Sequence, residues 1–129
     1  MSYVGVLIER KDGKMLFQLR DNKPHIHNPN KWGLFGGGIK REETPQGAAI
    51  RELKEELCLE INEKDFELLL KIPVIKKYIY RLKLDKMPVL KLKEGTDMQF
   101  FSSREILEKK NLVISLRIFL IIYHFISRK

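Results

Sequence analysis

One predicted helix constrains the fold of this chain more than any other feature. Thr44 is a favourable N-cap, and Pro45 suits the first position of a helix. Residues 45–58 are mostly helix formers, and their apolar members share one face through i, i+4 spacing: Ala49, Leu53 and Leu57. Because such a helix is stabilised mainly by burial of its apolar face, the rest of the chain must supply a core for it.

Apolar segments on both sides of this helix predict a sheet. The expected strands are residues 4–10, 15–20, 66–72, 74–84, 89–92 and 98–101. An Asp12-Gly13 turn joins the first two strands as a hairpin, and Pro73 is expected as a break or bulge. A capping box of Ser102 and Glu105 predicts a short helix to about residue 110, and a mostly apolar helix is predicted over residues 112–127. This order of elements indicates an α/β or α+β domain.

Composition limits the chain to a few broad classes of protein. The length of 129 residues suits one domain over residues 1–129, and 43% hydrophobic residues can form a core, which excludes a disordered chain. A single cysteine excludes an intramolecular disulfide and therefore a disulfide-rich secreted scaffold. No signal peptide is visible, and the apolar stretch 112–126 is shorter than the roughly 20 residues of a membrane span. We therefore expect a soluble, cytoplasmic protein with no membrane partner.

The chain is strongly basic. Its 25 Lys and Arg residues against 17 Asp and Glu residues give a formal net charge of +8. A positive field attracts nucleotides, nucleic acids and acidic membrane surfaces, whereas a solvated surface without a specific partner explains the charge equally well. No run of like charges reaches five residues, so an electrostatic arm for nucleic acid is not indicated.

Three consecutive glycines precede the strong helix. Gly36, Gly37 and Gly38 disfavour both helix and strand interiors, so this stretch is expected to be irregular backbone. Glycine-rich backbone exposes its N–H and C=O groups and lets an anionic phosphate approach closely. The sequence therefore predicts a phosphate-accessible loop that leads directly into the helix.

Three carboxylates cluster on that helix. Glu52, Glu55 and Glu56 stand at i, i+3 and i+4, where like charges repel, and they lie in the C-terminal half, where the helix dipole disfavours negative charge. A hard divalent cation such as Mg²⁺ binds oxygen ligands and offsets this repulsion. The alternative is an ordinary solvated helix surface on which Arg51 and Lys54 partly neutralise the cluster. The preceding glycines favour metal-assisted attack on a phosphoanhydride.

Residues 37–59 resemble the Nudix box. The fixed positions of the pattern are present at the required spacing, with five residues after the glycine and seven after the first glutamate: Gly37, Glu43, Arg51, Glu52, Leu53, Glu55, Glu56 and Leu59. The one departure is Cys58, which stands where the family has a helix-ending glycine. Cysteine adopts the left-handed conformation of such a turn less easily, so a longer helix or an altered turn is expected, with a small buried side chain.

The resemblance implies a fold and a set of roles. The family fold is an α/β/α sandwich around a mixed sheet. Glu52, Glu55 and Glu56 match the catalytic, metal-binding glutamates, with Glu56 as the innermost ligand and Glu52 as the residue that helps to activate water. The carbonyl of Gly36 is a further implied ligand. The implied cofactor is Mg²⁺, with Mn²⁺ as an alternative.

Other box residues have implied supporting roles. Arg51 and Glu43 are expected to pair and to orient the catalytic helix, and Gly37 is structural as well as close to substrate. The implied substrate contacts also include Gly38, Phe35 and Arg20. Glu94 or Asp97 is expected to supply an additional acid, although a plain turn explains them equally well.

Two further groups of residues are weaker candidates. His25 and His27 have the spacing of a transition-metal pair, but no third ligand is placed by the sequence. Four aromatic residues suit either base stacking or a core position: Trp32, Phe35, Tyr78 and Tyr80.

The resulting expectation is a Mg²⁺-dependent hydrolase. It would cleave a phosphoanhydride in a nucleoside diphosphate linked to another group, in a nucleoside triphosphate, a sugar nucleotide or a dinucleotide polyphosphate. The alternatives are a prenyl diphosphate isomerase, a non-catalytic nucleotide sensor that binds a protein partner, and an RNA pyrophosphohydrolase. The apolar helix over residues 112–127 is either deeply packed or part of a subunit contact, so a homodimer is an open expectation.

Overall fold

The computed structural model describes residues 1–26 and 28–127. Within this part of the chain, seven strands form one sheet. The strands are β1 (Ser2–Arg10), β2 (Met15–Leu19), β3 (Trp32–Gly33), β4 (Phe35–Ile39), β5 (Phe66–Ile72), β6 (Lys77–Leu84) and β7 (Asp97–Phe101). The helices are α1 (Pro45–Leu57), a short 3₁₀ turn η1 (Glu63–Asp65), α2 (Ser103–Leu107) and α3 (Ile114–Ser127). None of the described helices is both long and apolar enough to cross a membrane.

Strand β1 is the centre of the sheet. It runs parallel to β6 along its whole length, from the pair Tyr3–Lys77 to the pair Arg10–Leu84. On its other side it pairs antiparallel with β4 near its start and with β2 near its end. Strand β5 extends the sheet beyond β6, while β3 and β7 pair with β2. The sheet is therefore mixed.

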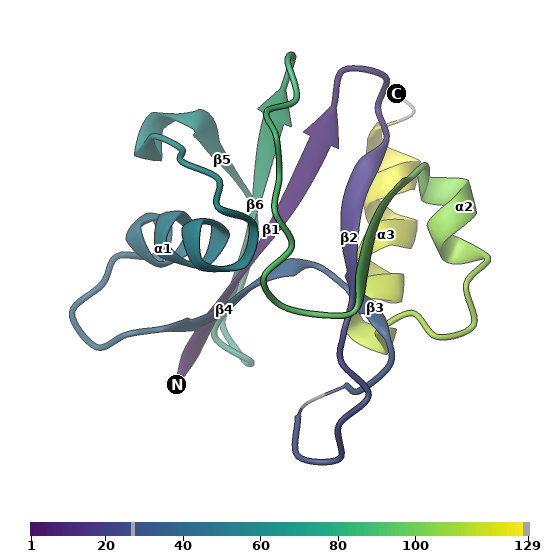
Figure 1. Cartoon of the computed structure of the whole chain (residues 1–129), viewed down its shortest axis with the longest axis horizontal. Helices are drawn as coiled ribbons and strands as arrows, with labels where there is room; N and C mark the ends of the chain where they lie inside the picture. Colours follow the sequence, from purple (N-terminus) through teal and green to yellow (C-terminus); the bar gives the residue numbers. More distant parts are fainter. Residues whose placement is uncertain (27, 128–129) are drawn as a thin grey trace.

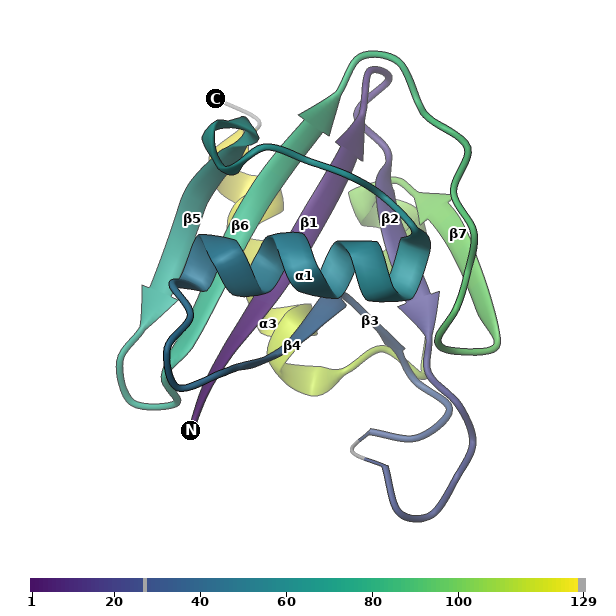
Figure 2. The ribbon, with the colours of Figure 1, turned by 60° about the vertical axis from the view of Figure 1, so that its left-hand side comes forward.

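Helical layers cover both faces of this sheet (Figures 1 and 2). Helix α1 lies on one face, where Leu53 and Leu57 pack with Val6, Phe35 and Leu82. Helices α2 and α3 lie on the other face, over a second apolar cluster centred on these residues: Leu7, Phe17, Trp32, Ile106, Leu116 and Leu120. The expected α/β/α sandwich is confirmed.

Residues next to α1 determine where the helix begins and where it ends. The hydroxyl of Thr44 accepts a hydrogen bond from the Gly47 N–H at 3.0 Å, as expected of an N-cap. At the other end, Cys58 adopts the left-handed conformation (φ 55°, ψ 32°), and its N–H donates to the carbonyls of Leu53 and Lys54. The expected longer helix or altered turn is therefore wrong. Cys58 is also exposed rather than buried, because it follows the last turn of the helix and lies off the face that packs on the core.

The glycines before α1 form a strand, so the expected irregular backbone is wrong. Gly36 and Gly37 pair with Gly5 and Val4 of β1. A Cβ at Gly36 would lie 2.0 Å from the Val4 carbonyl oxygen, and its φ of +144° is one that other residues rarely adopt. Strand pairing at this distance requires glycine, and tertiary contact outweighs the weak strand preference of the residue.

Residues 89–92 do not form the expected strand. The N–H groups of Lys91 and Lys93 instead donate to the carbonyls of Leu57 and Glu56 at 3.0 and 2.8 Å. The last carbonyls of a helix have no partner within it, so this segment satisfies two of them in place of a sheet ladder.

Other boundaries shift because of turns. Pro73 lies in the turn between β5 and β6, where the Lys76 N–H donates to its carbonyl, so β6 begins at Lys77 rather than at residue 74. The bulge of this hairpin lies between Leu68 and Leu70. The capping box of Ser102 is present, but α2 ends at Leu107 rather than near residue 110.

Candidate active site

Two glutamates of α1 point into the interior beside β4. Glu56 is 2% exposed and Glu52 is 9% exposed, whereas Glu55 is exposed at the edge of the site. The N–H of Gly36 donates to Glu56 Oε1 at 2.9 Å. Buried carboxylates are rare unless they are paired or bind a cation, so their burial here indicates a functional site.

The glycine strand makes room for these carboxylates. A Cβ at Gly37 would lie 2.6 Å from Glu52 Oε1, closer than real Cβ contacts allow. Glu52 therefore occupies space that any side chain at this position would fill. Glycine in β4 is therefore a condition for the burial of Glu52 at this place.

A third carboxyl group reaches the site from the loop before β7. Glu94 lies close enough to Glu56 and Glu52 for its charge to raise the pKa of both. The Gln18 side chain holds this loop by donating to the Glu94 carbonyl at 2.8 Å. Of the two acids expected here, Glu94 lies in the cluster. Asp97 instead accepts bonds from the Met98 N–H and the Gln99 side chain.

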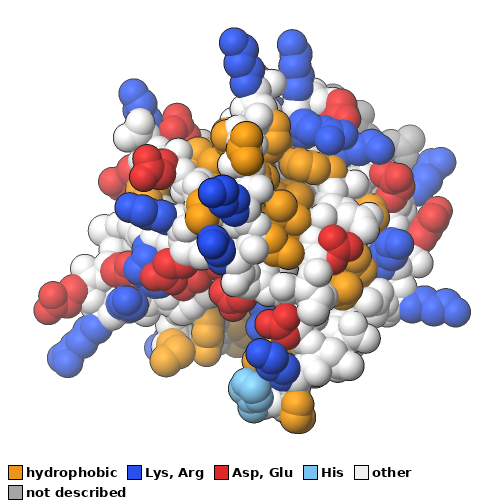
Figure 3. Space-filling model, in the orientation of Figure 1, with side chains coloured by type: hydrophobic (Ala, Val, Ile, Leu, Met, Phe, Trp, Pro, Cys, Tyr) orange, Lys and Arg blue, Asp and Glu red, His pale blue; other side chains and the backbone are white. Residues whose placement is uncertain are grey.

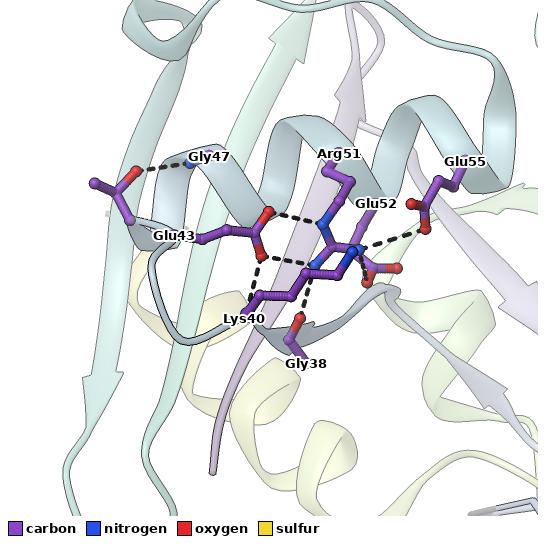
Figure 4. Close-up of polar contacts among 8 residues, drawn as sticks. Gly38, Lys40, Glu43, Gly47, Arg51, Glu52 and Glu55 are labelled. Atoms are coloured by element: carbon purple, nitrogen blue, oxygen red, sulfur yellow. Dashed lines mark hydrogen bonds and ion pairs between the residues drawn. The ribbon is translucent and has the colours of Figure 1, made fainter.

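Arg51 joins the strand, the loop and the helix (Figure 4). Its guanidinium donates to both carboxylate oxygens of Glu43, at 2.7 and 2.8 Å, and to the Gly38 carbonyl at 2.9 Å. It also donates to Glu52 Oε1 at 2.8 Å and to Glu55 at 3.4 Å. The expected pair of Arg51 and Glu43 is present, and it fixes the helix against β4 through a bidentate contact.

The charges around Arg51 shift the acidity of its partner. The hydrogen bond from Arg51, together with the Lys40 N–H, lowers the pKa of Glu43 to about 2. Glu43 therefore stays ionised at any physiological pH and keeps Arg51 in place.

The buried glutamates shift in the opposite direction. Burial raises the pKa of Glu52; the Arg51 hydrogen bond opposes this, and the charges of Glu55 and Glu94 add to it. Burial also raises the pKa of Glu56 far above its usual range; the Gly36 N–H opposes this, and Glu94 and Glu52 add to it. If both glutamates were ionised, the cluster would hold more negative charge than the described side chains around it compensate.

This imbalance makes stability depend on pH. The pKa of Glu56 is 4.5 in the unfolded chain and higher in the folded one. Such a group contributes its full stabilisation at pH values below the unfolded-state pKa, and this contribution is lost as the pH rises toward the folded-state pKa. With divalent cations chelated, we expect the free energy of unfolding of the wild type to fall from pH 5 to pH 8. The fall should exceed that of Glu56→Gln by about 1–3 kcal/mol, the cost of burying an uncompensated polar group. Urea denaturation at the two pH values measures it.

The control for this prediction is Glu108→Gln. Glu108 is exposed at the C-terminal end of α2, on the opposite side of the sheet, so this variant should follow the wild type. Parallel pH profiles for the wild type and Glu56→Gln would contradict the prediction.

The donor chemistry of the cluster suits a hard divalent cation. Its side chains offer carboxylate oxygens, and Mg²⁺ is held in proteins through one or two carboxylates with its remaining positions left to water and phosphate. Within residues 1–26 and 28–127, no three acidic, histidine or cysteine side chains are already drawn together as a complete ligand set. The arrangement fits an open site, in which Glu52 and Glu56 would hold the cation and leave its remaining positions to water and substrate.

The remaining candidates are dispersed. Arg20 lines a small hollow with Glu94, Gln18 and Gly95, at the edge of the cluster. Phe35 is fully buried beneath α1, so the expected substrate contact through its ring is wrong. Trp32 and Tyr80 are also core residues. His27 lies outside the described residues, and the histidine pair is not tested.

Sequence reasoning missed Gln18 and Gly95. Gln18 is 2% exposed and is a polar residue within the apolar strand β2. A Cβ at Gly95 would lie 2.8 Å from the Leu19 carbonyl oxygen and from Gln18 Cγ. The sequence signal for Gln18 was a polar residue at an inward position of an apolar strand. Such a side chain needs a buried hydrogen-bond partner, which indicates a polar contact at that place.

The mixed sheet, the two helical layers and the acidic helix beside a glycine strand together define a domain of the Nudix fold. The family model of the NUDIX domain matches residues 1–116. The chain belongs to the Nudix family.

Solved structures share the fold over nearly the whole chain. The MutT protein from Methanosarcina mazei superposes with a TM-score of 0.76 at 22% identity, covering 100% of this chain and 96% of that one. An Ap4A hydrolase from C. elegans superposes with a TM-score of 0.72 at 21% identity, covering 99% of this chain and all of the other. At such identities the likeness concerns the fold.

Curated relatives match a shorter segment. An RNA pyrophosphohydrolase of Hydrogenovibrio crunogenus is 40% identical over 57 residues, which cover 44% of this chain and 31% of the relative. A second RNA pyrophosphohydrolase, from a Marinomonas species, is 39% identical over the same length. The match thus spans about a third of the length of these relatives.

Proposed function

We propose that this protein is a divalent-cation-dependent pyrophosphohydrolase. It cleaves a phosphoanhydride in a nucleoside diphosphate linked to another group. The observation that carries the proposal is the burial of Glu52 and Glu56 against a glycine strand. Among residues 1–26 and 28–127, no Lys or Arg side chain forms an ion pair with Glu56. A cluster used only for structure would not keep a buried, uncompensated carboxylate at that position.

The cation would be held by Glu52 and Glu56, with Glu55 at the edge, the carbonyl of Gly36 and Glu94 as further donors. Bound Mg²⁺, or Mn²⁺ in its place, neutralises charge on the phosphates and lowers the pKa of water. In the reaction a water oxygen forms a bond to phosphorus while the bond to the bridging oxygen breaks. A proton of that water passes to a base, and the leaving phosphate carries away the electron pair.

The protein groups supply position and proton transfer. Arg51 holds Glu52 through its 2.8 Å hydrogen bond and anchors the helix through Glu43. Glu52 is the proposed base, because burial raises its pKa and so brings that pKa closer to neutral pH than the pKa of an exposed glutamate. Backbone groups of Gly37 and Gly38 and the side chain of Arg20 are the proposed phosphate contacts.

A second candidate substrate is RNA with a 5′ polyphosphate end. The 57-residue match to two RNA pyrophosphohydrolases is the reason to consider this substrate. On the face shown in Figure 3, Lys and Arg side chains are scattered over the middle and the edge, interspersed with carboxylates. A spread of this kind suits a small polyanion better than a long strand, which needs a continuous basic track.

The test is release of phosphate and pyrophosphate from a substrate panel. The panel contains nucleoside triphosphates, sugar nucleotides, dinucleotide polyphosphates and a triphosphorylated oligoribonucleotide, each with Mg²⁺ or with chelator. We expect turnover of one class that the chelator abolishes. Turnover of RNA alone, with affinity that falls steeply with salt, would favour the second candidate.

Two other results would overturn the proposal. Nucleotide binding without turnover of any compound would identify a sensor rather than an enzyme. Isomerisation of a prenyl diphosphate without phosphate release would identify a different enzyme on the same scaffold.

A further inference from the structure

Helix α3 has two apolar faces, and the described residues of the chain cover only one of them. Leu116 and Leu120 lie on the inner face, 6% and 0% exposed, in the cluster beneath the helix. The outer residues are all half exposed or more: Ile114, Ile118, Ile121, Ile122, Phe125 and Ile126. A helix that covers a sheet normally presents polar residues to solvent, so this outer face has no partner within the part of the chain that the structure describes.

The outer residues follow the spacing of a helix–helix seam. Ile114, Ile118, Ile121 and Phe125 are separated by four, three and four positions. This alternation keeps apolar side chains along one line of a helix and is the pattern through which two helices pack. At about 100° per residue, the line lies opposite Leu116 and Tyr123, which point to the core.

The area of the outer face is that of a stable interface. Its six side chains expose on the order of 700 Å², close to the roughly 800 Å² that each partner buries in an interface of standard size. The largest apolar patch of an ordinary monomer is about 300–600 Å². The face is therefore larger than an isolated subunit of this size normally leaves in water.

Charge does not oppose contact along the seam. Arg117 is the one Lys, Arg, Asp or Glu residue within Ile114–Ser127, and its guanidinium donates to the carbonyls of Leu107 and Lys109. The helix is fixed from beneath, because Tyr123 donates to Glu9 at 2.9 Å and accepts from Arg81 at 3.1 Å. The outer face is thus rigid, apolar and free of charge at its centre.

We propose that the outer face of α3 binds the same face of a second copy of this chain. A two-fold interface places one patch against itself, so the patch must complement itself. A continuous apolar row meets this condition, whereas a row with charges of one sign does not. A membrane-surface helix instead carries many Lys and Arg residues along its polar face, and the described part of α3 has one arginine, which is already bonded.

The dimer leaves each candidate active site open. Helix α3 and helix α1 cover opposite faces of the sheet, so a partner on α3 does not approach Glu52 or Glu56 (Figure 2). The proposal is therefore independent of the proposed activity, and each can fail without the other.

Sedimentation velocity of the full chain tests the dimer. We expect a species of twice the 15.3 kDa subunit mass at micromolar concentration, and tighter association at 500 mM than at 50 mM NaCl, because each subunit carries a net charge of +8. Ile118→Glu and Ile121→Glu should each weaken dimerisation at least about tenfold. Val74→Glu is the matched control, since Val74 is 91% exposed in the β5–β6 turn, away from the seam.

A second measurement separates loss of the dimer from loss of the fold. The Tm of the wild type should rise with protein concentration, and that of Ile118→Glu should not, while both keep the same circular dichroism spectrum. A wild type that is monomeric at 100 µM would overturn the proposal. So would a dimer that persists in both seam variants, or a monomer that sediments with phosphatidylserine vesicles through the same residues.

Discussion

Replacement of Glu56 with glutamine is expected to reduce kcat/KM by about a thousandfold, which corresponds to roughly 4 kcal/mol of transition-state stabilisation. Glutamine has the size of glutamate, and its carbonyl oxygen can still accept the hydrogen bond from the Gly36 N–H. It lacks the negative charge that a divalent cation requires, and its amide group brings a donor toward Glu94. The variant removes the chemistry of the site while its packing stays unchanged. Steady-state kinetics on the substrate class identified by the panel measures the effect.

Glu108→Gln is again the matched control and should retain wild-type kinetics. The thermal unfolding of Glu56→Gln with and without Mg²⁺ gives a readout that does not depend on turnover. Mg²⁺ should stabilise the wild type and leave this variant unaffected, because a ligand stabilises only the fold that binds it. Activity within tenfold of the wild type would remove Glu56 from the proposed site.

Gly36→Ala is expected to destabilise the fold by about 3–5 kcal/mol, through both a backbone conformation unsuited to alanine and overpacking against β1. The new Cβ would lie 2.0 Å from the Val4 carbonyl oxygen and 2.9 Å from the Gly5 Cα. Both of these atoms belong to the backbone of the central strand, so neither moves without disturbing the sheet. Urea denaturation at pH 6 measures the loss.

Gly38→Ala is the matched control two positions along the same strand. Its Cβ would meet nothing closer than Met1 Sδ at 4.0 Å. We expect its free energy of unfolding to remain within about 0.5 kcal/mol of the wild type, as for most surface substitutions. Equal stability of the two alanine variants would show that β4 can separate from β1 at little cost.

Features of the fold that depend on neighbouring residues could be predicted from the sequence. Thr44 and Pro45 mark the start of α1 because a cap and a fixed φ act within one turn. Ser102 and Glu105 mark α2 in the same way. The spacing of Glu52 and Glu56 places them on one inner face, since helical periodicity is a local property.

Features that depend on distant partners could not be predicted in this way. Gly36 belongs to a strand because β1 lies beside it, and composition alone argues against a strand there. Residues 89–92 look like a strand, yet they bond to the end of α1. Phe35 resembles a base-stacking residue until the helix above it is placed. The choice between Glu94 and Asp97 likewise depends on Gln18, which holds the loop from the neighbouring strand β2.

The central position of β1 has a consequence for synthesis of the protein. Its parallel partner β6 begins at Lys77. When residues 1–70 have been synthesised, β4 and the whole of α1 are therefore present, but the strand that pairs with β1 on its other side is not. Chains emerge at about 5–20 residues per second, so the interval in which residues 58–84 emerge, from the end of α1 to the end of β6, lasts about 1–5 seconds. During it, the nascent chain exposes the edge of β1 and an uncovered sheet face. Chaperones that recognise unpaired strand edges should therefore bind this protein before residue 77 emerges and release it soon afterwards.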